Sequence, residues 1–165
     1  MSTTAEVDVR GPRFAAWITS AVLVVTLVAS AFSAPVAAAI LILQAAVFAI
    51  SALRGPRHSL YGLLYATVVA PHLGPVTERE PVPPLKFAQL VGFAFAAIGV
   101  VAFASGLILL GQIATTFALI AAFLNAAFGI CLGCQLYPLV TRMRPSAFRT
   151  SAHRGRTPAS AGPIR

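Results

Sequence analysis

The sequence predicts an all-α, polytopic membrane protein with four transmembrane helices and a short interfacial helix in its central loop. Of its 165 residues, 58% are hydrophobic and 10% are charged, whereas a soluble domain carries about 25% charged residues. The apolar residues gather in long uncharged stretches, and about 20 such residues are needed to cross a bilayer as a helix. Basic residues flank these stretches. A soluble globular domain is therefore excluded.

The first predicted span covers residues 14–32, FAAWITSAVLVVTLVASAF, and follows a polar N-terminal segment of residues 1–13. A helix of about 19 residues crosses a hydrocarbon core of roughly 30 Å. A cleaved signal peptide is the alternative, because small residues follow the apolar run. The apolar region of a signal peptide is about 7–15 residues long. The length of this run therefore favours a retained helix.

The second predicted span covers residues 36–53, VAAAILILQAAVFAISAL, after a short turn that ends at Pro35. Proline suits the first turn of a helix, where its missing N–H has no partner to lose. Gln44 is the one strongly polar side chain in this span. We expect it to form a hydrogen bond with a neighbouring helix, an interaction of about 1 kcal/mol or less in membranes.

The central loop contains an apolar segment, residues 59–71, that is too short to cross a bilayer. Tyr61 and Tyr65 lie on one side of a helix at i and i+4. We expect an interfacial or re-entrant helix with its tyrosines at headgroup level. A short helix packed against the bundle is the alternative. The proline-rich residues 72–86 that follow are predicted to be a solvated loop.

The third and fourth predicted spans cover residues 87–110 and 113–136. Together they are too long for one crossing, and either Ser105-Gly106 or Gly111-Gln112 would suit the turn between them. The four spans make up a transmembrane domain of residues 14–140. Residues 141–165 are basic and rich in Ser, Pro and Gly, a composition typical of a disordered tail.

Charge distribution predicts the orientation. All 12 Lys and Arg residues lie in the N-terminal segment, the central loop or the C-terminal tail. The positive-inside rule places these three parts in the cytoplasm, in a multi-pass protein of a bacterial inner membrane. A net charge of +8 could also indicate nucleic-acid binding, but here no basic face or known module supports it. The spans contain no Asp, Glu, Lys or Arg, which argues against an ion-coupled transporter.

Cys131 and Cys134 form a C-x-x-C motif, the one group of residues in this sequence whose spacing indicates a reactive site. Residues at i and i+3 share a helix face, so the thiols can meet as a dithiol/disulfide couple. At the end of the fourth span the helix dipole would oppose a thiolate, unless Gly129 or Gly133 breaks the helix. Compensating positive charge would come from basic residues nearby: Arg142, Arg144, His58 and His72.

Three interpretations of the cysteine pair stay open. Thiol redox or sulfur transfer is favoured narrowly, by the close spacing of the two cysteines and by their position near the membrane boundary. A structural zinc site needs about four ligands, so His58 and His72 or a second chain would have to complete it. Alternatively, both cysteines pack as small apolar residues. Asn125, earlier on the same span, is expected to hydrogen-bond between helices.

Four segments resemble a bacterial membrane family described as domain of unknown function 4395, over about residues 7–140. The segments are VDVRGPRF at 7–14, RGPRHSL at 54–60, PPLKFAQ at 83–89 and AFGICLGCQLY at 127–137. Members of this family occur in genomes near thioredoxin-like proteins and thiosulfate sulfurtransferases. The resemblance therefore implies a thiol or persulfide role for the cysteines, with a cytoplasmic thioredoxin-like or sulfurtransferase partner.

These observations lead to one hypothesis and one alternative, and neither specifies a cofactor. The hypothesis is an inner-membrane protein that takes part in thiol-disulfide or sulfur (persulfide) handling through a cytoplasmic-side C-x-x-C. In it, Cys134 lies nearer the membrane boundary and meets the partner's sulfur, while Cys131 resolves the mixed disulfide. The alternative is a non-catalytic scaffold or complex subunit in which the same two cysteines are structural.

Overall fold

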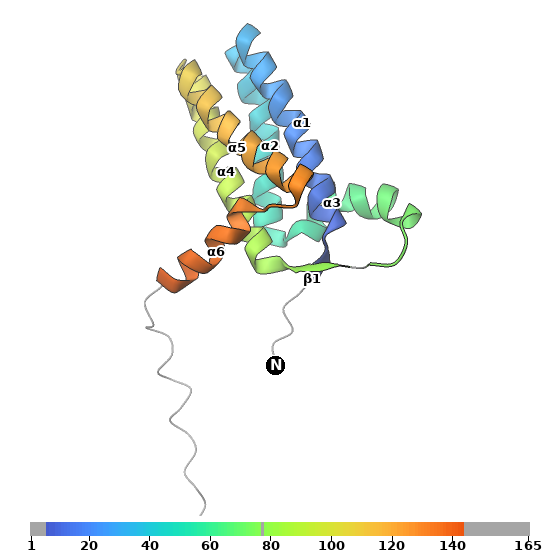
Figure 1. Cartoon of the computed structure of the whole chain (residues 1–165). Coiled ribbons are helices and arrows are strands. Elements are labelled where there is room, and N and C mark those ends of the chain that lie inside the picture. The colour runs from blue at the N-terminus through green and yellow to red at the C-terminus, as the bar shows by residue number, and fades with distance from the viewer. Residues whose placement is uncertain (1–5, 77, 144–165) are drawn as a thin grey trace, which may run out of the picture.

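The computed structural model describes residues 6–76 and 78–143. Four long helices form a bundle: α1 (Arg10–Phe32), α2 (Ala34–Arg54), α4 (Val82–Ala104) and α5 (Ile108–Phe128) (Figure 1). Each of the four is long and apolar enough to cross a membrane. The predicted fold class, an all-α protein with four membrane-spanning helices, is confirmed.

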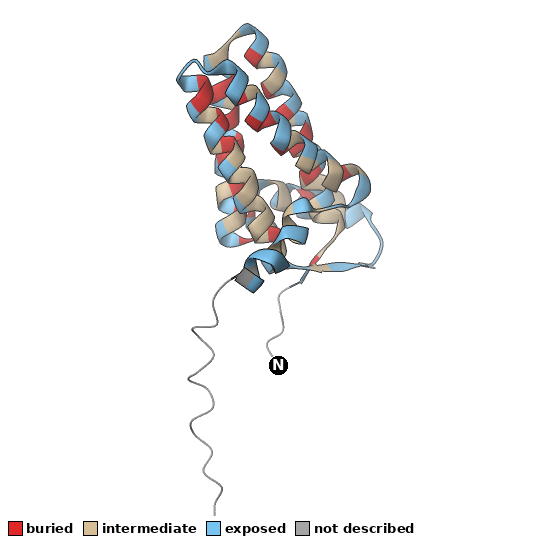
Figure 2. Cartoon of the chain, turned by 60° about the vertical axis from the view of Figure 1, so that its left-hand side comes forward, coloured by how far each residue is buried: buried red, intermediate tan, exposed pale blue. Residues whose placement is uncertain are grey.

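The bundle exposes large apolar side chains and buries small and polar ones, as a lipid-facing protein does. Phe32 is 87% exposed and Leu109 is 71% exposed, whereas Thr26 and Thr115 are fully buried. Figure 2 shows the buried residues along the inner sides of the helices. In lipid an exposed apolar side chain costs nothing, while close packing and hydrogen bonds hold the helices together. This distribution fits a bilayer and not water.

Small residues allow the helices to approach closely. A Cβ atom added at Gly99 of α4 would lie 2.6 Å from Cδ2 of Leu41 on α2. Across the same bundle, Gln44 donates a hydrogen bond from Nε2 to Thr19 Oγ1 of α1 at 3.4 Å. The prediction that Gln44 bonds a neighbouring helix is confirmed. Packing of this kind matches the membrane pattern of small interfacial residues with occasional polar contacts.

The predicted limits of the third and fourth spans differ from those of the helices. The third span begins at Val82 instead of residue 87, because prolines lacking an N–H are tolerated in a first helical turn. It ends at Ala104 instead of residue 110, because the chain turns at Ser105-Gly106, one of the two alternatives predicted. The fourth span accordingly begins at Ile108 instead of residue 113. The fourth span, predicted to reach residue 136, ends at Phe128. A separate helix, α6 (Leu132–Met143), follows at an angle to the bundle (Figure 1).

The central loop is mostly helical, with η1 at Pro56–His58, α3 at Leu60–Leu64, a π-helical turn η2 at Tyr65–Val69, and η3 at Ala70–His72. A short helix was predicted here, but its tyrosines face the bundle. Tyr61 donates a hydrogen bond to Gln44 Oε1 at 2.7 Å, and Tyr65 donates one to Asp8 Oδ2 at 3.1 Å. Packing against the bundle was the alternative interpretation. An interfacial position for this segment remains a prediction.

A short antiparallel strand pair closes the same end of the bundle. β1 (Glu6–Asp8) pairs with β2 (Arg79–Pro81), and Val7 lies opposite Glu80. The sequence predicted a polar N-terminal segment and a solvated loop at these positions, and neither strand was expected. The pairing brings the N-terminal segment to the start of α4, beside α6. Of the tail predicted to be disordered, residues 144–165 lie outside the described part of the chain.

Candidate functional site: the cysteine pair at the start of α6

A left-handed glycine separates the cysteine pair from the long helix before it. Gly129 has φ +69° and ψ +13°, a conformation that glycine adopts without strain and that commonly ends helices. The N–H groups of Gly129 and Ile130 donate to the carbonyls of Asn125 and Leu124 at 3.1 and 3.2 Å. The last turn of α5 is therefore closed before the first cysteine is reached.

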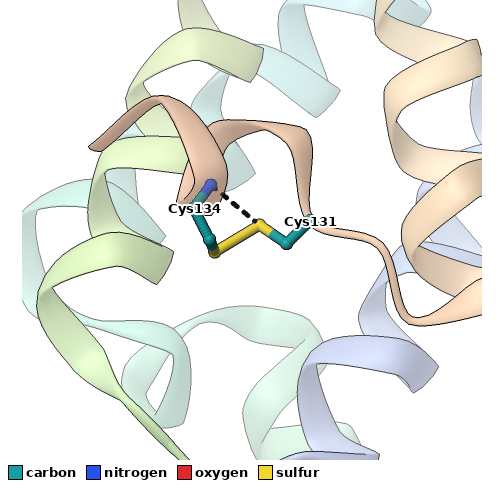
Figure 3. Close-up of a disulfide and its surroundings, with 2 residues drawn as sticks. All are labelled: Cys131 and Cys134. Atoms are coloured by element: carbon teal, nitrogen blue, oxygen red, sulfur yellow. Dashed lines mark hydrogen bonds between the residues drawn. A yellow bond between two sulfur atoms is a disulfide. The ribbon is translucent and has the colours of Figure 1, made fainter. Parts of the chain in front are cut away.

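Cys131 caps the next helix. The backbone N–H of Gln135 donates to the Cys131 carbonyl at 3.1 Å, the first hydrogen bond of α6. The N–H of Cys134 donates to Cys131 Sγ at 3.3 Å (Figure 3). A serine or aspartate oxygen usually accepts this bond at a helix N-terminus. The sulfur of Cys131 takes that place.

The two cysteines form a disulfide, with their Cα atoms 5.2 Å apart (Figure 3). This separation lies within the usual range for disulfides. Because α6 starts after Cys131, the pair lies at the positive end of a helix dipole. The prediction of a dipole that opposes a thiolate was therefore wrong. The exception that the sequence allowed, a break at Gly129, is the arrangement found, and it favours a thiolate at Cys131.

A groove of about 330 Å³ gives access to both sulfur-bearing residues. It is bordered by β2, the start of α4 and the loop before α6. Its lining residues are Glu80, Pro81, Pro84, Leu85, Gly129, Cys131, Cys134 and Gln135. Burial and the negative charge of Glu78 raise the pKa of Glu80, and the positive charge of Arg13 acts in the opposite direction. An incoming sulfur would meet the disulfide beside this carboxyl group.

A second cavity, of about 250 Å³, lies on the bundle side of the same pair. Cys131 borders both spaces, whereas Cys134 borders the groove alone. Gly133 packs against α4 so closely that an added Cβ would lie 2.6 Å from Ala88 Cβ. The ring of Tyr137 lies 6.0 Å from that of Phe87. These contacts hold α6 on α4, with the disulfide between the two spaces.

Arg13 supports the site from α1. Its Nη2 lies 3.5 Å from the carbonyl oxygen of Ala126 and 3.4 Å from that of Ala127. A guanidinium at the carbonyl end of α5 complements the negative end of its dipole. Both carbonyls lie in the last turn of α5, just before the helix ends at Gly129. Arg13 therefore helps to fix where the cysteine loop begins.

The other residues proposed as partners of the cysteines are placed elsewhere. Among the described residues, no group of three or more His, Cys, Asp or Glu side chains is arranged to hold a metal ion. His72 bonds to the Val68 carbonyl at 2.9 Å, within the central loop. Arg142 lies in the last turn of α6, the opposite end from the cysteines, and Arg144 lies outside the described residues. Glu80 and Arg13 were missed, although Arg13 is part of the VDVRGPRF segment.

Fold and site together define a helical membrane-type protein with a disulfide between an outer groove and the bundle interior. The chain belongs to the family described as Domain of unknown function (DUF4395), whose model matches residues 7–142. No curated protein and no solved structure matches the chain. Family membership agrees with the four resembling segments, and the match extends through most of α6.

Proposed function

We propose that this protein carries out thiol-disulfide exchange with a cytoplasmic protein at the inner membrane, through Cys131 and Cys134. One observation carries the proposal: Cys131 Sγ is the acceptor of an N-terminal helix N–H. A purely structural disulfide does not need a sulfur that accepts a hydrogen bond at a helix N-terminus. A reactive one benefits, because stabilising a thiolate lowers the pKa of its thiol.

The exchange begins at Cys134. A thiolate of the partner enters the groove and attacks Cys134 Sγ, the disulfide bond breaks, and Cys131 leaves as a thiolate. A leaving thiol with a lower pKa leaves faster, and the Cys134 N–H and the dipole of α6 supply that stabilisation. A second thiolate of the partner then attacks the partner's own sulfur in the mixed disulfide. The partner leaves oxidised, and Cys131 and Cys134 hold the two electrons as thiolates that take up protons.

The distribution of charges supports an orientation for the bundle in the membrane. The strand pair, the central helical segment and α6 lie at one end of the bundle (Figure 1), and the Arg and Lys residues of the described part of the chain lie in or next to these segments. The positive-inside rule supports a cytoplasmic position for this end, within the lipid bilayer of a bacterial cell. A thioredoxin-like or sulfurtransferase protein has the kind of thiol that the groove would admit. The resemblance to the family implies the same class of partner.

The alternative is a scaffold whose disulfide fastens α6 to the bundle. The close packing of Gly133 on Ala88 favours this role, because it places the crosslinked turn directly on α4. A scaffold disulfide would stay closed in the cell. A disulfide at an exchange site would alternate between its oxidised and reduced forms.

Trapping with single-cysteine variants tests the proposal. Cys131→Ser leaves Cys134 able to hold a partner but removes the Cys131 thiolate, whose attack on Cys134 Sγ would reverse the exchange. Acid quenching and alkylation block the partner's own second thiol, so a mixed disulfide should be recovered. Cys134→Ser should trap much less, and the double serine variant is the control. Nonreducing gels of membranes from each strain, followed by mass spectrometry of any adduct, give the result. Absence of an adduct from Cys131→Ser, in protein of normal abundance, would leave the scaffold role standing.

A further inference from the structure

The interior cavity beside the disulfide is bordered by all four long helices, by the η1–α3 segment of the central loop and by the start of α6. Its lining is mostly apolar or small, with three phenylalanine rings, Phe48, Phe95 and Phe117, among the larger groups. The rings of Phe95 and Phe117 stack with centroids 6.1 Å apart. Since the surrounding helices face lipid on their outer sides, a ligand of this cavity would be apolar and of small cross-section.

Two amide side chains that line the cavity have no hydrogen-bond partner among the described residues, so the predicted interhelical hydrogen bond of Asn125 is not found there. Gln89 of α4 and Asn125 of α5 both line it and are half-buried, and neither side chain has a hydrogen bond within residues 6–76 and 78–143. Thr19 and Tyr61 also line the cavity, but their hydroxyls are bonded to Gln44. Amide N–H groups inside an apolar bundle are costly without an acceptor. A ligand with carbonyl oxygens would supply acceptors.

The cavity also ends at the disulfide, because Cys131 forms part of its wall. Exchange with a partner leaves Cys131 and Cys134 reduced, and a second turnover needs a two-electron acceptor. A water-soluble acceptor would have to use the groove that the partner occupies. A lipid-soluble acceptor would reach the cysteine pair through the interior of the bundle instead.

We propose that this cavity binds the ring of a lipid-soluble quinone, whose carbonyl oxygens accept hydrogen bonds from the amides of Gln89 and Asn125. The inference rests on the proposed exchange function and supplies its oxidant. A quinone ring is flat and apolar, suits phenylalanine walls, and carries the two acceptors that the amides require. Cys131 lines the same cavity, so a bound ring would lie next to the cysteine pair.

The reaction balances as a two-electron transfer. The thiols of Cys131 and Cys134 lose their two S–H bonds, and one S–S bond forms between them. The two electrons and two protons released convert both ring carbonyls of the quinone into the hydroxyls of a quinol. The regenerated disulfide is the form that accepts the next partner thiolate.

Binding can be measured without the exchange reaction. The Cys131→Ser/Cys134→Ser protein in lipid nanodiscs is titrated calorimetrically with decylubiquinone, and empty nanodiscs give the partition background. We expect saturable binding with one site per chain. Adding Gln89→Leu and Asn125→Leu should weaken it about twentyfold, because each hydrogen bond contributes a factor of about four to five. Gln112→Leu removes an amide that bonds Ser30 in another part of the bundle, and it should leave quinone affinity unchanged.

The outcomes separate the two proposals. Binding no greater than in empty nanodiscs, or equal binding by the Gln89/Asn125 variant, overturns the quinone site while leaving partner trapping unaffected. With intact cysteines, reduced protein should form one quinol for each disulfide made. Saturable binding without any partner adduct or quinol would instead refute exchange and the oxidant role, leaving a ligand site alone. Thermal unfolding of each variant checks that the bundle is intact.

Discussion

Arg13 and Ala127 lie 114 residues apart in the chain, and the Nη2 atom of Arg13 lies 3.4 Å from the Ala127 carbonyl oxygen. The first helix thereby holds the end of the last long helix, at the point where the cysteine loop begins. A positive side chain is well placed at this carbonyl end, where the partial charge of the helix is negative. The contact links the stability of the bundle to the position of the disulfide.

Replacing this arginine should destabilise the protein and loosen the cysteine loop. Arg13→Gln removes the charge at the end of α5, an interaction of about 1 kcal/mol, and should lower the melting temperature by about 2–4 °C. The disulfide should also be reduced faster by dithiothreitol. Arg142→Gln, at the far end of α6, is the control and should change neither value. Equal behaviour of the two variants would show that Arg13 does not position the site.

Gly129 should govern thiol reactivity as well as stability. Gly129→Ala places a side chain at φ +69°, at a cost of about 1–2 kcal/mol, and favours continuation of α5 through the cysteines. The thiols would then lose their place at a helix N-terminus, so alkylation of the reduced protein by iodoacetamide should slow.

Gly106 offers a matched control for that change. It has φ +76° in the turn between α4 and α5, and an added Cβ meets no atom within 4 Å. Gly106→Ala should therefore cost similar stability and leave the alkylation rate as it is in the natural protein. Slowing by both variants to the same extent would indicate a general loss of structure instead.

Glu80 should make stability depend on pH. Burial and Glu78 raise its pKa in the folded protein above the ordinary carboxyl value, so the folded state keeps a proton that the unfolded chain has released. Its stabilising contribution is complete below the unfolded pKa and is lost as the pH rises through the folded pKa. Glu80→Gln, which stays neutral, should gain melting temperature relative to the natural protein as the pH rises above the ordinary carboxyl pKa of about 4.3. The same change at exposed Glu6 is the control, and parallel profiles for all three proteins would refute the effect.

Gly133 should be intolerant of a side chain. The added methyl of Gly133→Ala would lie 2.6 Å from Ala88 Cβ, so α6 must move away from α4, at a cost of about 1–3 kcal/mol typical of overpacking. We expect a lower melting temperature and weaker protection of the disulfide from reductant. Gly74→Ala, in the open central loop where nothing lies within 4 Å of the new atom, should be neutral. A neutral Gly133→Ala would mean that α6 is not held on α4 by this contact.

Hydropathy was sufficient to predict the four long helices, because lipid imposes a length and an absence of charge that can be counted along the chain. It failed at Gly129, where the run of uncharged residues continues from α5 into α6 without a change in composition. Whether a glycine inside such a run ends a helix depends on contacts made elsewhere, here those of Arg13 with the last carbonyls of α5. The cysteine motif was identified, but its position at a helix N-terminus was not.

Contacts between distant segments were also beyond prediction. The strands of β1 and β2 have three residues each, too few for any alternation to show, and they pair across the first two spans. Glu80 therefore seemed to be one more charge in a solvated loop, although it borders the groove of Cys131 and Cys134. Gln44, by contrast, was predicted correctly because a lone amide in an apolar span has few alternatives to a neighbouring helix.

The groove has a consequence for biogenesis. Its walls come from β2, the first turn of α4 and the residues after α5, and β1 holds β2 from the very start of the polypeptide. During insertion by the translocon, the early helices enter the bilayer before any of these walls meets the cysteines. The groove around the cysteine pair is therefore completed by the last part of the domain to leave the ribosome, after all four long helices have been made.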